Sequence, residues 1–378
     1  MKKKLLLINP VDRSRKGLWI NHSSRYPPLV FGIIARLTPP DWEIEVIDEN
    51  LEVFEFRKAD MVAFTAFTSS VNRAYSIAGL YREQKIPTVM GGVHASVLPE
   101  EAEQYVDAVV VGDAENVWPE IIKDVENGTL KKRYHKPLAS LAGIPLPDHS
   151  IFSKSYMFGS VHTTRGCPLN CSFCAVQSVY KGKYYMRPVE EVLADIEQTP
   201  WQMIAFIDDN LRGHSQESRE RIYAIFEGMI ERKLNKIWWS HVSLDVAYDE
   251  KFLDLAERSG CKLLFIGIEA EDDEALKEIN KKTNLRISGS KYREAIRNIQ
   301  RHGITVLGAV MYGLDSDTAV RMKHRTRFIL RSRIDALQIL PLIPFPGTQV
   351  FRQLDHEGRL ILNDFPKDWY LFDGLEVV

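Results

Sequence analysis

The sequence predicts an α/β protein with two parallel β-sheets, an open doubly wound sheet followed by a partial barrel of six βα units. Three observations support this. Short apolar runs alternate with amphipathic stretches over residues 1–130 and again from residue 156 onward. The stretch 136–152 carries three prolines and little periodicity, as linkers do. Polar, glycine-rich loops follow the apolar runs of the first series, where parallel sheets bind ligands.

The first series predicts a Rossmann-like, flavodoxin-like sheet with helices on both faces. We expect its strands at 5–9, 44–48, 61–67, 88–90 and 108–111, with helices such as 28–37 and 71–82. Because the carboxyl ends of parallel strands share one edge, the loops 12–17, 65–70, 91–96 and 112–115 should lie together there. Their glycines and small hydroxylic residues let a backbone approach a large ligand, so this edge is predicted to hold a cofactor.

The second series predicts a partial (β/α)6 TIM barrel that opens at the carboxyl ends of its strands. The strands are expected at 159–164, 203–208, 237–242, 262–269, 305–311 and 336–342, with helices at 188–198, 218–232, 250–259 and 291–302. The charged stretch 271–282 should be a solvated helix and loop. The predicted division is a first domain at 1–135, a linker at 136–155, the barrel at 156–345 and a short C-terminal extension at 346–378, which should leave the barrel mouth open.

Composition excludes several classes of protein. The 378 residues contain 49 Lys and Arg against 51 Asp and Glu, so no electrostatic attraction to nucleic acid is expected. The basic N-terminus leads into an apolar run that ends at Asn9 and Pro10, too short for a signal peptide, and no stretch is long enough to span a membrane. We therefore expect a cytoplasmic protein that acts on a small-molecule or peptide substrate.

Three of the 4 cysteines form a single motif, Cys167-Pro-Leu-Asn-Cys171-Ser-Phe-Cys174. Three thiolates can hold three irons of a [4Fe-4S] cluster and leave the fourth iron open, whereas electron-transfer clusters normally take four cysteines. A structural zinc site is the alternative, but it needs four ligands and the chain has no second CxxC or HxxxH. Cys261 lies in an apolar run and is expected to be a buried core residue.

With Phe173 before its last cysteine, directly after the first barrel strand, this motif resembles the radical S-adenosylmethionine (SAM) superfamily. Other segments resemble those members that carry an N-terminal cobalamin (B12)-binding domain, the class B methylases. With these segments the resemblance covers nearly the whole chain; they are 90–95, 111–115, 206–210, 267–269, 307–313 and 342–348.

The resemblance implies that the open iron chelates the amino and carboxylate groups of SAM, so that one electron yields a 5′-deoxyadenosyl radical. It also implies an external electron donor of the flavodoxin or ferredoxin type. The residues expected to contact SAM are Phe173, Asp208, Asp209, Asn210, Ser243, Glu269, Gly308, Met311 and Tyr312. For two of them another role fits equally well: Asn210 could cap the next helix, and Met311 could be a core residue.

The first domain departs from the best-known cobalamin motif. Residues 12–17 have DxHxxG spacing, but Ser14 stands where a histidine would be the lower axial ligand, so this loop offers no imidazole to cobalt. His94 follows a Gly-Gly turn, although a lone histidine is more often structural. The residues expected to contact cobalamin are Ser14, Thr65, Ser69, Gly91, Gly92, His94, Gly112 and Glu115.

The leading hypothesis is a cobalamin-dependent radical SAM enzyme that methylates an unactivated carbon. One SAM would supply the methyl group through methylcobalamin and another the hydrogen-abstracting radical. A first alternative is a radical SAM enzyme that cyclises or rearranges its substrate, with cobalamin auxiliary or absent. A second is a non-catalytic iron–sulfur or zinc protein. The sequence identifies no further catalytic residue.

Overall fold

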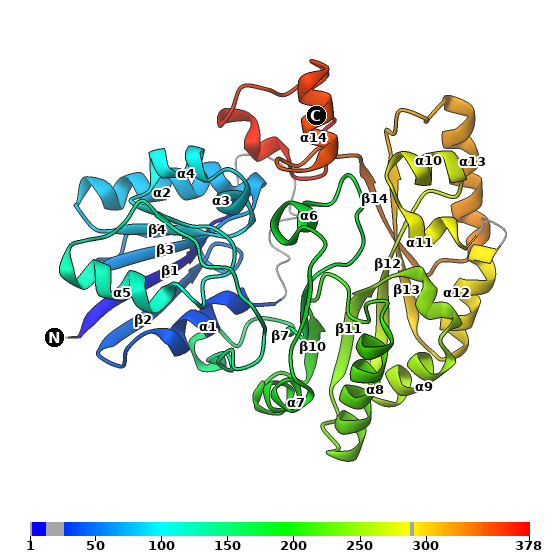
Figure 1. The fold of residues 1–378 in the computed structure, drawn as a ribbon, viewed down its shortest axis with the longest axis horizontal. Coiled ribbons are helices and arrows are strands. Elements are labelled where there is room, and N and C mark those ends of the chain that lie inside the picture. Colours follow the sequence, from blue (N-terminus) through cyan, green and yellow to red (C-terminus); the bar gives the residue numbers. More distant parts are fainter. Residues whose placement is uncertain (1, 13–25, 288–290) are drawn as a thin grey trace.

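The computed structural model describes residues 2–12, 26–287 and 291–378, whose strands form two six-stranded parallel sheets and one two-stranded antiparallel ribbon (Figure 1). The predicted fold class is therefore confirmed. The first sheet lies in the blue and cyan part of the chain, and the second spans the green to orange part. None of the described helices is long and apolar enough to cross a membrane.

The first sheet has the strand order β2-β1-β3-β4-β5-β6. The chain leaves β1 toward one edge and β3 toward the other, so the loops that follow these two strands part and leave a crevice. The strands are β1 (Lys3–Asn9), β2 (Trp42–Asp48), β3 (Met61–Thr65), β4 (Thr88–Gly91), β5 (Ala108–Val110) and β6 (Arg133–Tyr134). The short β6 was not predicted.

Helices cover both faces of this sheet because its central strands are apolar on both sides. Along β1, Leu5 and Leu7 pack in one core with the first and fifth helices, whereas Leu6 and Ile8 pack in another with the second and fourth. The helices are α1 (Leu29–Leu37), α2 (Val71–Glu83), α3 (Val93–Val97), α4 (Pro99–Tyr105) and α5 (Trp118–Asn127), and the 3-10 turn η2 (Thr68–Ser70) precedes α2.

The second sheet runs in sequential order, β14-β13-β12-β11-β10-β7, which is the order of a partial barrel. Its strands are β7 (Gly159–Val161), β10 (Met203–Phe206), β11 (Ile237–Val242), β12 (Cys261–Glu269), β13 (Thr305–Tyr312) and β14 (Ala336–Pro341). The predicted strand 159–164 is interrupted: β7 ends at Val161, and β8 (Thr164–Gly166) instead pairs antiparallel with β9 (Tyr184–Met186).

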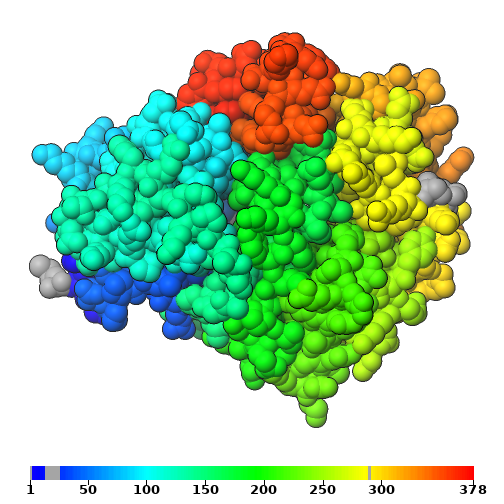
Figure 2. Space-filling view, in the orientation of Figure 1, coloured from blue at the N-terminus to red at the C-terminus, as the bar shows by residue number. Residues whose placement is uncertain are grey.

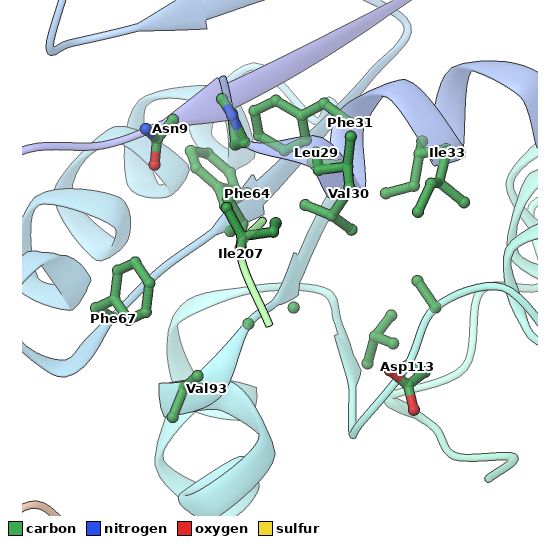
Figure 3. A pocket seen from close by; sticks show the side chains of 18 of the residues that line it. Asn9, Leu29, Val30, Phe31, Ile33, Phe64, Phe67, Val93, Asp113 and Ile207 are labelled. Atoms are coloured by element: carbon green, nitrogen blue, oxygen red, sulfur yellow. The ribbon is translucent and has the colours of Figure 1, made fainter. Parts of the chain in front are cut away.

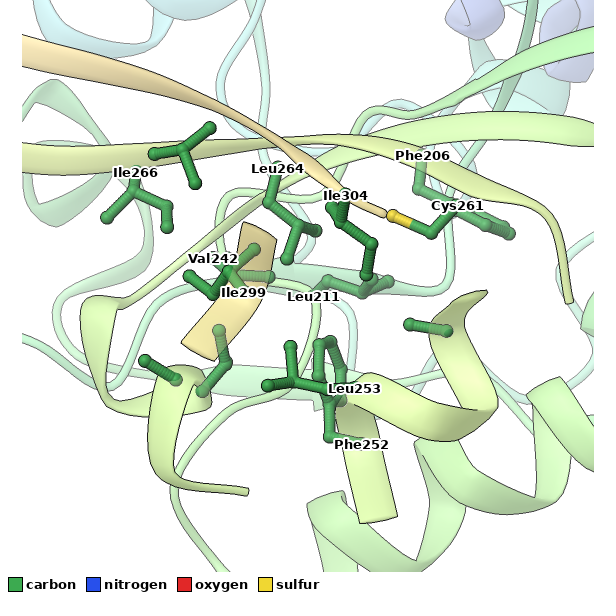
Figure 4. Close-up of a cluster of buried hydrophobic side chains, with 14 of the residues drawn as sticks. Phe206, Leu211, Val242, Phe252, Leu253, Cys261, Leu264, Ile266, Ile299 and Ile304 are labelled. Atoms are coloured by element: carbon green, nitrogen blue, oxygen red, sulfur yellow. The ribbon is translucent and has the colours of Figure 1, made fainter. Parts of the chain in front are cut away.

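The outer face of the second sheet packs against helices through one large core, in which Cys261 is fully buried as expected (Figure 4). The helices that lie between these strands along the chain are α6 (Ala175–Tyr180), α7 (Val189–Gln198), α8 (Gln216–Glu231), α9 (Glu250–Arg258), α10 (Asp273–Glu278), α11 (Lys282–Leu285), α12 (Tyr292–Arg301) and α13 (Ala319–Ser332).

The C-terminal extension contains α14 (Gln349–His356) and the 3-10 turn η6 (Lys367–Leu371), and it folds back onto the first sheet's helices. Trp369 Nε1 donates to Glu101 of α4 at 2.9 Å, and Asn72 of α2 donates to the carbonyl of Lys367 at 2.9 Å. Figure 2 shows this orange-red segment lying across the junction of the two sheets. The extension therefore ties the end of the barrel to the helices of the first sheet.

Candidate active site at the junction of the two sheets

The three motif cysteines lie on the loop between β8 and α6, with Cys167 and Cys171 buried and Cys174 partly buried. Burial raises the pKa of all three thiols, that of Cys174 to about 12. Among the described residues, no three His, Cys, Asp or Glu side chains are arranged to hold a single metal ion. Three thiols on one short loop fit a cluster with one open iron.

Asp208 shapes the backbone ahead of this loop. Its Oδ1 accepts from the backbone N–H of Thr163 at 2.8 Å, from the N–H of Thr164 and from the Thr164 hydroxyl at 2.7 Å. These bonds hold the chain where β7 ends and β8 begins. Burial raises the pKa of Asp208 to about 6, although the hydrogen bonds oppose this. Asp208 is thus a structural brace, and it does not line the cavities described below.

The next two residues approach the cluster loop from the end of β10. Asp209 accepts from the N–H of Gly166 at 2.9 Å and lines both cavities. Asn210 donates from Nδ2 to Ser243 Oγ at 3.0 Å, and the same nitrogen lies 3.9 Å from Cys167 Sγ. The capping alternative for Asn210 is wrong, because Ser215 caps the next helix. Three expected positions are therefore gathered beside the cysteines.

Of the three residues of β13 that are expected to contact SAM, one lies beside the site and two point away from it. Met311 packs in an apolar cluster with Phe173 of the cysteine loop, so these two stay beside the site. Gly308 faces outward, because a Cβ there would meet Ile334 at 3.1 Å. Tyr312 also points away, since its hydroxyl lies 3.0 Å from the Thr326 hydroxyl of α13. The structure therefore removes Gly308 and Tyr312 from the expected set.

Glu269 is not free, because its Oε1 lies 2.8 Å from the buried ammonium group of Lys281. Burial lowers the pKa of Lys281, but Glu269 and the thiol of Cys171 raise it beyond its ordinary value. The expectation that 271–282 is solvated is wrong at this residue. A lysine at the end of a charged stretch gave no sequence signal that it would lie beside the cysteines.

A cavity of about 630 Å³ opens between the strand ends of the two sheets (Figure 3). We call it the junction cavity. Its first wall comes from β1, α1 and β3, where Asn9, Leu29 and Phe64 project. Its second wall comes from the ends of β7 and β10 and from β8, through residues 162, 164, 165, 207 and 209. An adjoining cavity of about 390 Å³ shares Gly92, Gly112 and Asp209 with it and reaches α6, directly after Cys174.

The loops of the first sheet line the junction cavity through Thr65, Gly91, Gly92 and Gly112. Gly92 has φ +97°, and a Cβ there would lie 2.8 Å from the backbone of Ala66, so only glycine fits this turn. Two glycines and a small hydroxyl leave a cradle for a broad ligand at this edge.

Two other expected cobalamin contacts are not among the lining residues, and a third, Ser14, lies outside the described residues. Ser69 lines neither cavity. His94 is fully buried, with Nδ1 3.2 Å from Thr68 Oγ1 and Nε2 3.1 Å from Glu101 Oε1. The histidine is thus a packing residue that connects η2 with α4, which corrects the expectation for it.

Glu115 takes part in an ion-pair cluster between β8 and the loop after β5, which we call the clasp. Arg165 donates to Asp113 at 2.6 Å and to Glu115 at 2.5 Å, and Tyr180 donates to Asp113 at 3.0 Å. Arg165 lies two residues before Cys167, so the clasp connects the cysteine loop with the loop after β5. Sequence reasoning found Glu115 but missed Arg165 and Asp113, since no local pattern pairs residues about 50 positions apart.

Comparison with known families identifies the chain. The family model described as the Radical SAM superfamily matches residues 161–328, and the model described as the B12 binding domain matches residues 32–122. The chain belongs to the radical SAM superfamily. The residues matched by the two models contain the cysteine loop and most of the first sheet, so this radical SAM enzyme carries a B12-binding domain ahead of its barrel.

Among relatives of this radical SAM enzyme, a bacteriochlorophyllide d C-12(1)-methyltransferase of Chlorobaculum tepidum is 28% identical over 98% of this chain and 81% of the relative. An anaerobic magnesium-protoporphyrin IX monomethyl ester cyclase of Rubrivivax gelatinosus is 24% identical over 85% of this chain and 62% of the relative. The radical SAM methyltransferase TsrM from Kitasatospora setae, solved with tryptophan and a SAM analogue, shares the fold with a TM-score of 0.76 and 17% identity, covering 94% of this chain and 76% of that one.

Proposed function

We propose that this enzyme transfers a methyl group to an unactivated carbon, using a [4Fe-4S] cluster, SAM and cobalamin. The observation that carries the proposal is that two cavities share lining residues: one is lined by the glycine-rich loops of the B12-binding domain, and the other reaches α6 directly after the cysteine loop. A methyl carrier and a radical source must both reach one substrate carbon, and adjoining cavities allow this. The methyltransferase relative supports the transfer reaction.

Cys167, Cys171 and Cys174 would hold the cluster, which supplies the electron that splits SAM into a carbon radical and methionine. Asp209, Asn210 and Ser243 would hydrogen-bond polar groups of SAM, because their side chains lie beside the cysteine loop. Phe173 and Met311 would supply an apolar surface beside them. The carboxylate of Asp209 can accept from an ammonium group. Lys281 adds positive charge close to the thiols.

Cobalamin would occupy the junction cavity and supply the methyl group. Thr65, Gly91, Gly92 and Gly112 leave room for it, and the apolar wall formed by α1 and β3 fits the face of a large macrocycle. The clasp holds the two walls of the cavity together, and the C-terminal extension covers part of the junction. Both features would limit access of water to a reactive intermediate. An external electron donor and a reducing, cytoplasmic setting are part of the same proposal.

The test is anaerobic reconstitution with iron, sulfide and cobalamin, followed by metal analysis. We expect about four irons per chain, as a cubane cluster requires, and about one cobalt per chain. Reduced protein given SAM should release 5′-deoxyadenosine. With SAM that carries a deuterated methyl group, a substrate from cell extract should gain that group, whereas a cyclase product would lose hydrogen without gaining mass from SAM.

Cysteine variants give the matched control. Alanine at any of the three motif positions should abolish SAM cleavage and lower iron content, because each thiolate binds one iron. Cys261→Ala removes a buried cysteine of the outer core, so this variant should retain the iron of the cluster. Iron binding without 5′-deoxyadenosine would contradict the radical mechanism. SAM cleavage by a protein that retains no cobalt would contradict methyl transfer through cobalamin.

A further inference from the structure

His162 follows the last residue of β7 and lines the junction cavity on the wall formed by the second sheet. Val161 packs in the outer core, so the next side chain along the strand points the opposite way, toward the B12-binding domain. Ser160 projects to that same side, where its hydroxyl donates to the carbonyl of Pro27 at 2.7 Å. Figure 3 shows the side chain of Ile207 in the cavity, and its backbone N–H donates to the carbonyl of Val161 at 2.9 Å.

His162 is 4% exposed, and its Nε2 has no hydrogen-bond partner among the described residues. Two other buried polar side chains on this cavity are already paired: Glu115 with Arg165, and Thr164 with Asp208. Buried polar atoms nearly always have partners, so an unpaired ring nitrogen in a cavity wall points to a missing ligand group.

The surroundings keep this imidazole neutral. Burial and the guanidinium groups of Arg165, Arg187 and Arg221 hold its pKa well below the ordinary value. These arginines are engaged elsewhere, for example Arg187 with Asp195 at 2.8 Å and Arg221 with the carbonyl of Thr163 at 2.7 Å. A neutral imidazole offers one N–H donor and one acceptor nitrogen, the combination that a carboxamide complements.

We propose that His162 hydrogen-bonds a carboxamide arm of the bound corrin ring and so forms a polar contact between the radical SAM barrel and cobalamin. The inference rests on the proposed function, because it requires cobalamin in the junction cavity. Since the contact comes from the barrel, it would fix the corrin relative to the cysteine loop that begins five residues later. His162 is a positioning residue in this scheme.

The test measures the dissociation constant of hydroxocobalamin by equilibrium dialysis on the full-length, cluster-loaded protein. Loss of one buried hydrogen bond should weaken binding about tenfold in His162→Leu. His162→Gln should restore most of the affinity, because its amide both donates and accepts. The matched control is His214→Leu, which removes another histidine whose buried Nε2 lacks a partner but which lines neither cavity, and it should bind as wild type does.

Dicyanocobinamide keeps carboxamide arms on the corrin and lacks the nucleotide tail, so the same loss is expected with it. A loss confined to cobalamin would place the contact on the tail and overturn the proposal. Equal affinity of wild type and His162→Leu would overturn it while leaving the proposed function intact. Wild-type protein that binds neither corrinoid would overturn both. If His162→Leu loses iron, His162→Phe, which retains a ring of similar size, replaces it in the same comparison.

Discussion

At the scale of single residues, the polar side chains around the cysteine loop divide into those that shape the backbone and those that face the cavities. Asp208 uses one oxygen for the chain at Thr163 and Thr164, and its buried second oxygen has no partner in the described part of the chain. Asp209, its neighbour, lines both cavities. Adjacent carboxylates therefore have different tasks, because one turns toward the sheet and the other toward the open space.

The raised pKa of Asp208 gives a prediction about pH. The folded protein keeps the proton until about pH 6, whereas the unfolded chain releases it near 3.8, so this group lowers stability as pH rises between these values. The slope is at most about 1.4 kcal/mol per pH unit. Asp208→Asn keeps an acceptor oxygen and lacks the titration, so the wild type should lose stability relative to it from pH 4 to 6. Urea unfolding at several pH values measures this, and parallel curves would contradict the assigned pKa.

At the scale of elements, two connections secure the cysteine loop. On one side the clasp ties β8 to the loop after β5. On the other, the extension contacts the loop directly, because the N–H of Val350 in α14 donates to the carbonyl of Ser172 at 3.2 Å. The loop is therefore supported by segments that lie far from it in sequence.

Arg165→Leu should lower the free energy of unfolding by about 3–5 kcal/mol, because it leaves the buried carboxylate of Glu115 and the partly buried one of Asp113 without a counter-charge. Arg359→Leu removes an exposed pair with Asp315 and should change stability far less. Denaturant titration of both variants measures the difference. Similar losses in the two variants would show that the clasp is not an energetic connection.

Trp369→Ala should release the extension from the B12-binding domain. The ring is 2% exposed, stacks on Phe365 at 3.7 Å between centroids and donates to Glu101. A loss of about 3–5 kcal/mol is expected for removing so large a buried side chain. Hydrogen exchange should rise in η6 and in the facing parts of α2 and α4. Trp369→Phe keeps most of the packing and should show a smaller rise, and equal exchange in both variants would contradict docking through the ring.

At the scale of the whole molecule, two sheets share one cavity whose walls come from different parts of the chain. We propose the division 1–135, 136–155, 156–345 and 346–378 for the B12-binding domain, linker, barrel and extension. The two parallel sheets lie within the first and third of these ranges. Because the extension packs in the same core as the helices of the first sheet, it connects the barrel to the B12-binding domain in addition to the linker.

Ligand binding at the junction should therefore stabilise the whole chain. Hydroxocobalamin at about one hundred times its dissociation constant adds about 2.7 kcal/mol if only the folded state binds it. Calorimetry with and without the corrinoid should show a higher melting temperature, with the two halves melting together. A shift confined to one of two separate transitions would show that the halves do not couple.

The amino-acid sequence by itself determined the strand and helix pattern, the two-sheet class and the cysteine motif. These features are local: alternating apolar runs such as those of β1 and β12 follow from short-range periodicity, and Cys167, Cys171 and Cys174 lie within eight positions of one another. Local signals also found Gly92, because a tight turn requires glycine whatever surrounds it.

Only the tertiary structure decided which polar residues face the cavities. Glu115 is paired because Arg165 of β8 meets it. His94 is occupied because Glu101 and Thr68 bond to it, and Tyr312 turns outward to α13. His162 carried no signal in the sequence. Burial, pairing and direction depend on partners from distant segments, and those partners are brought together only when the two sheets and the extension pack against one another.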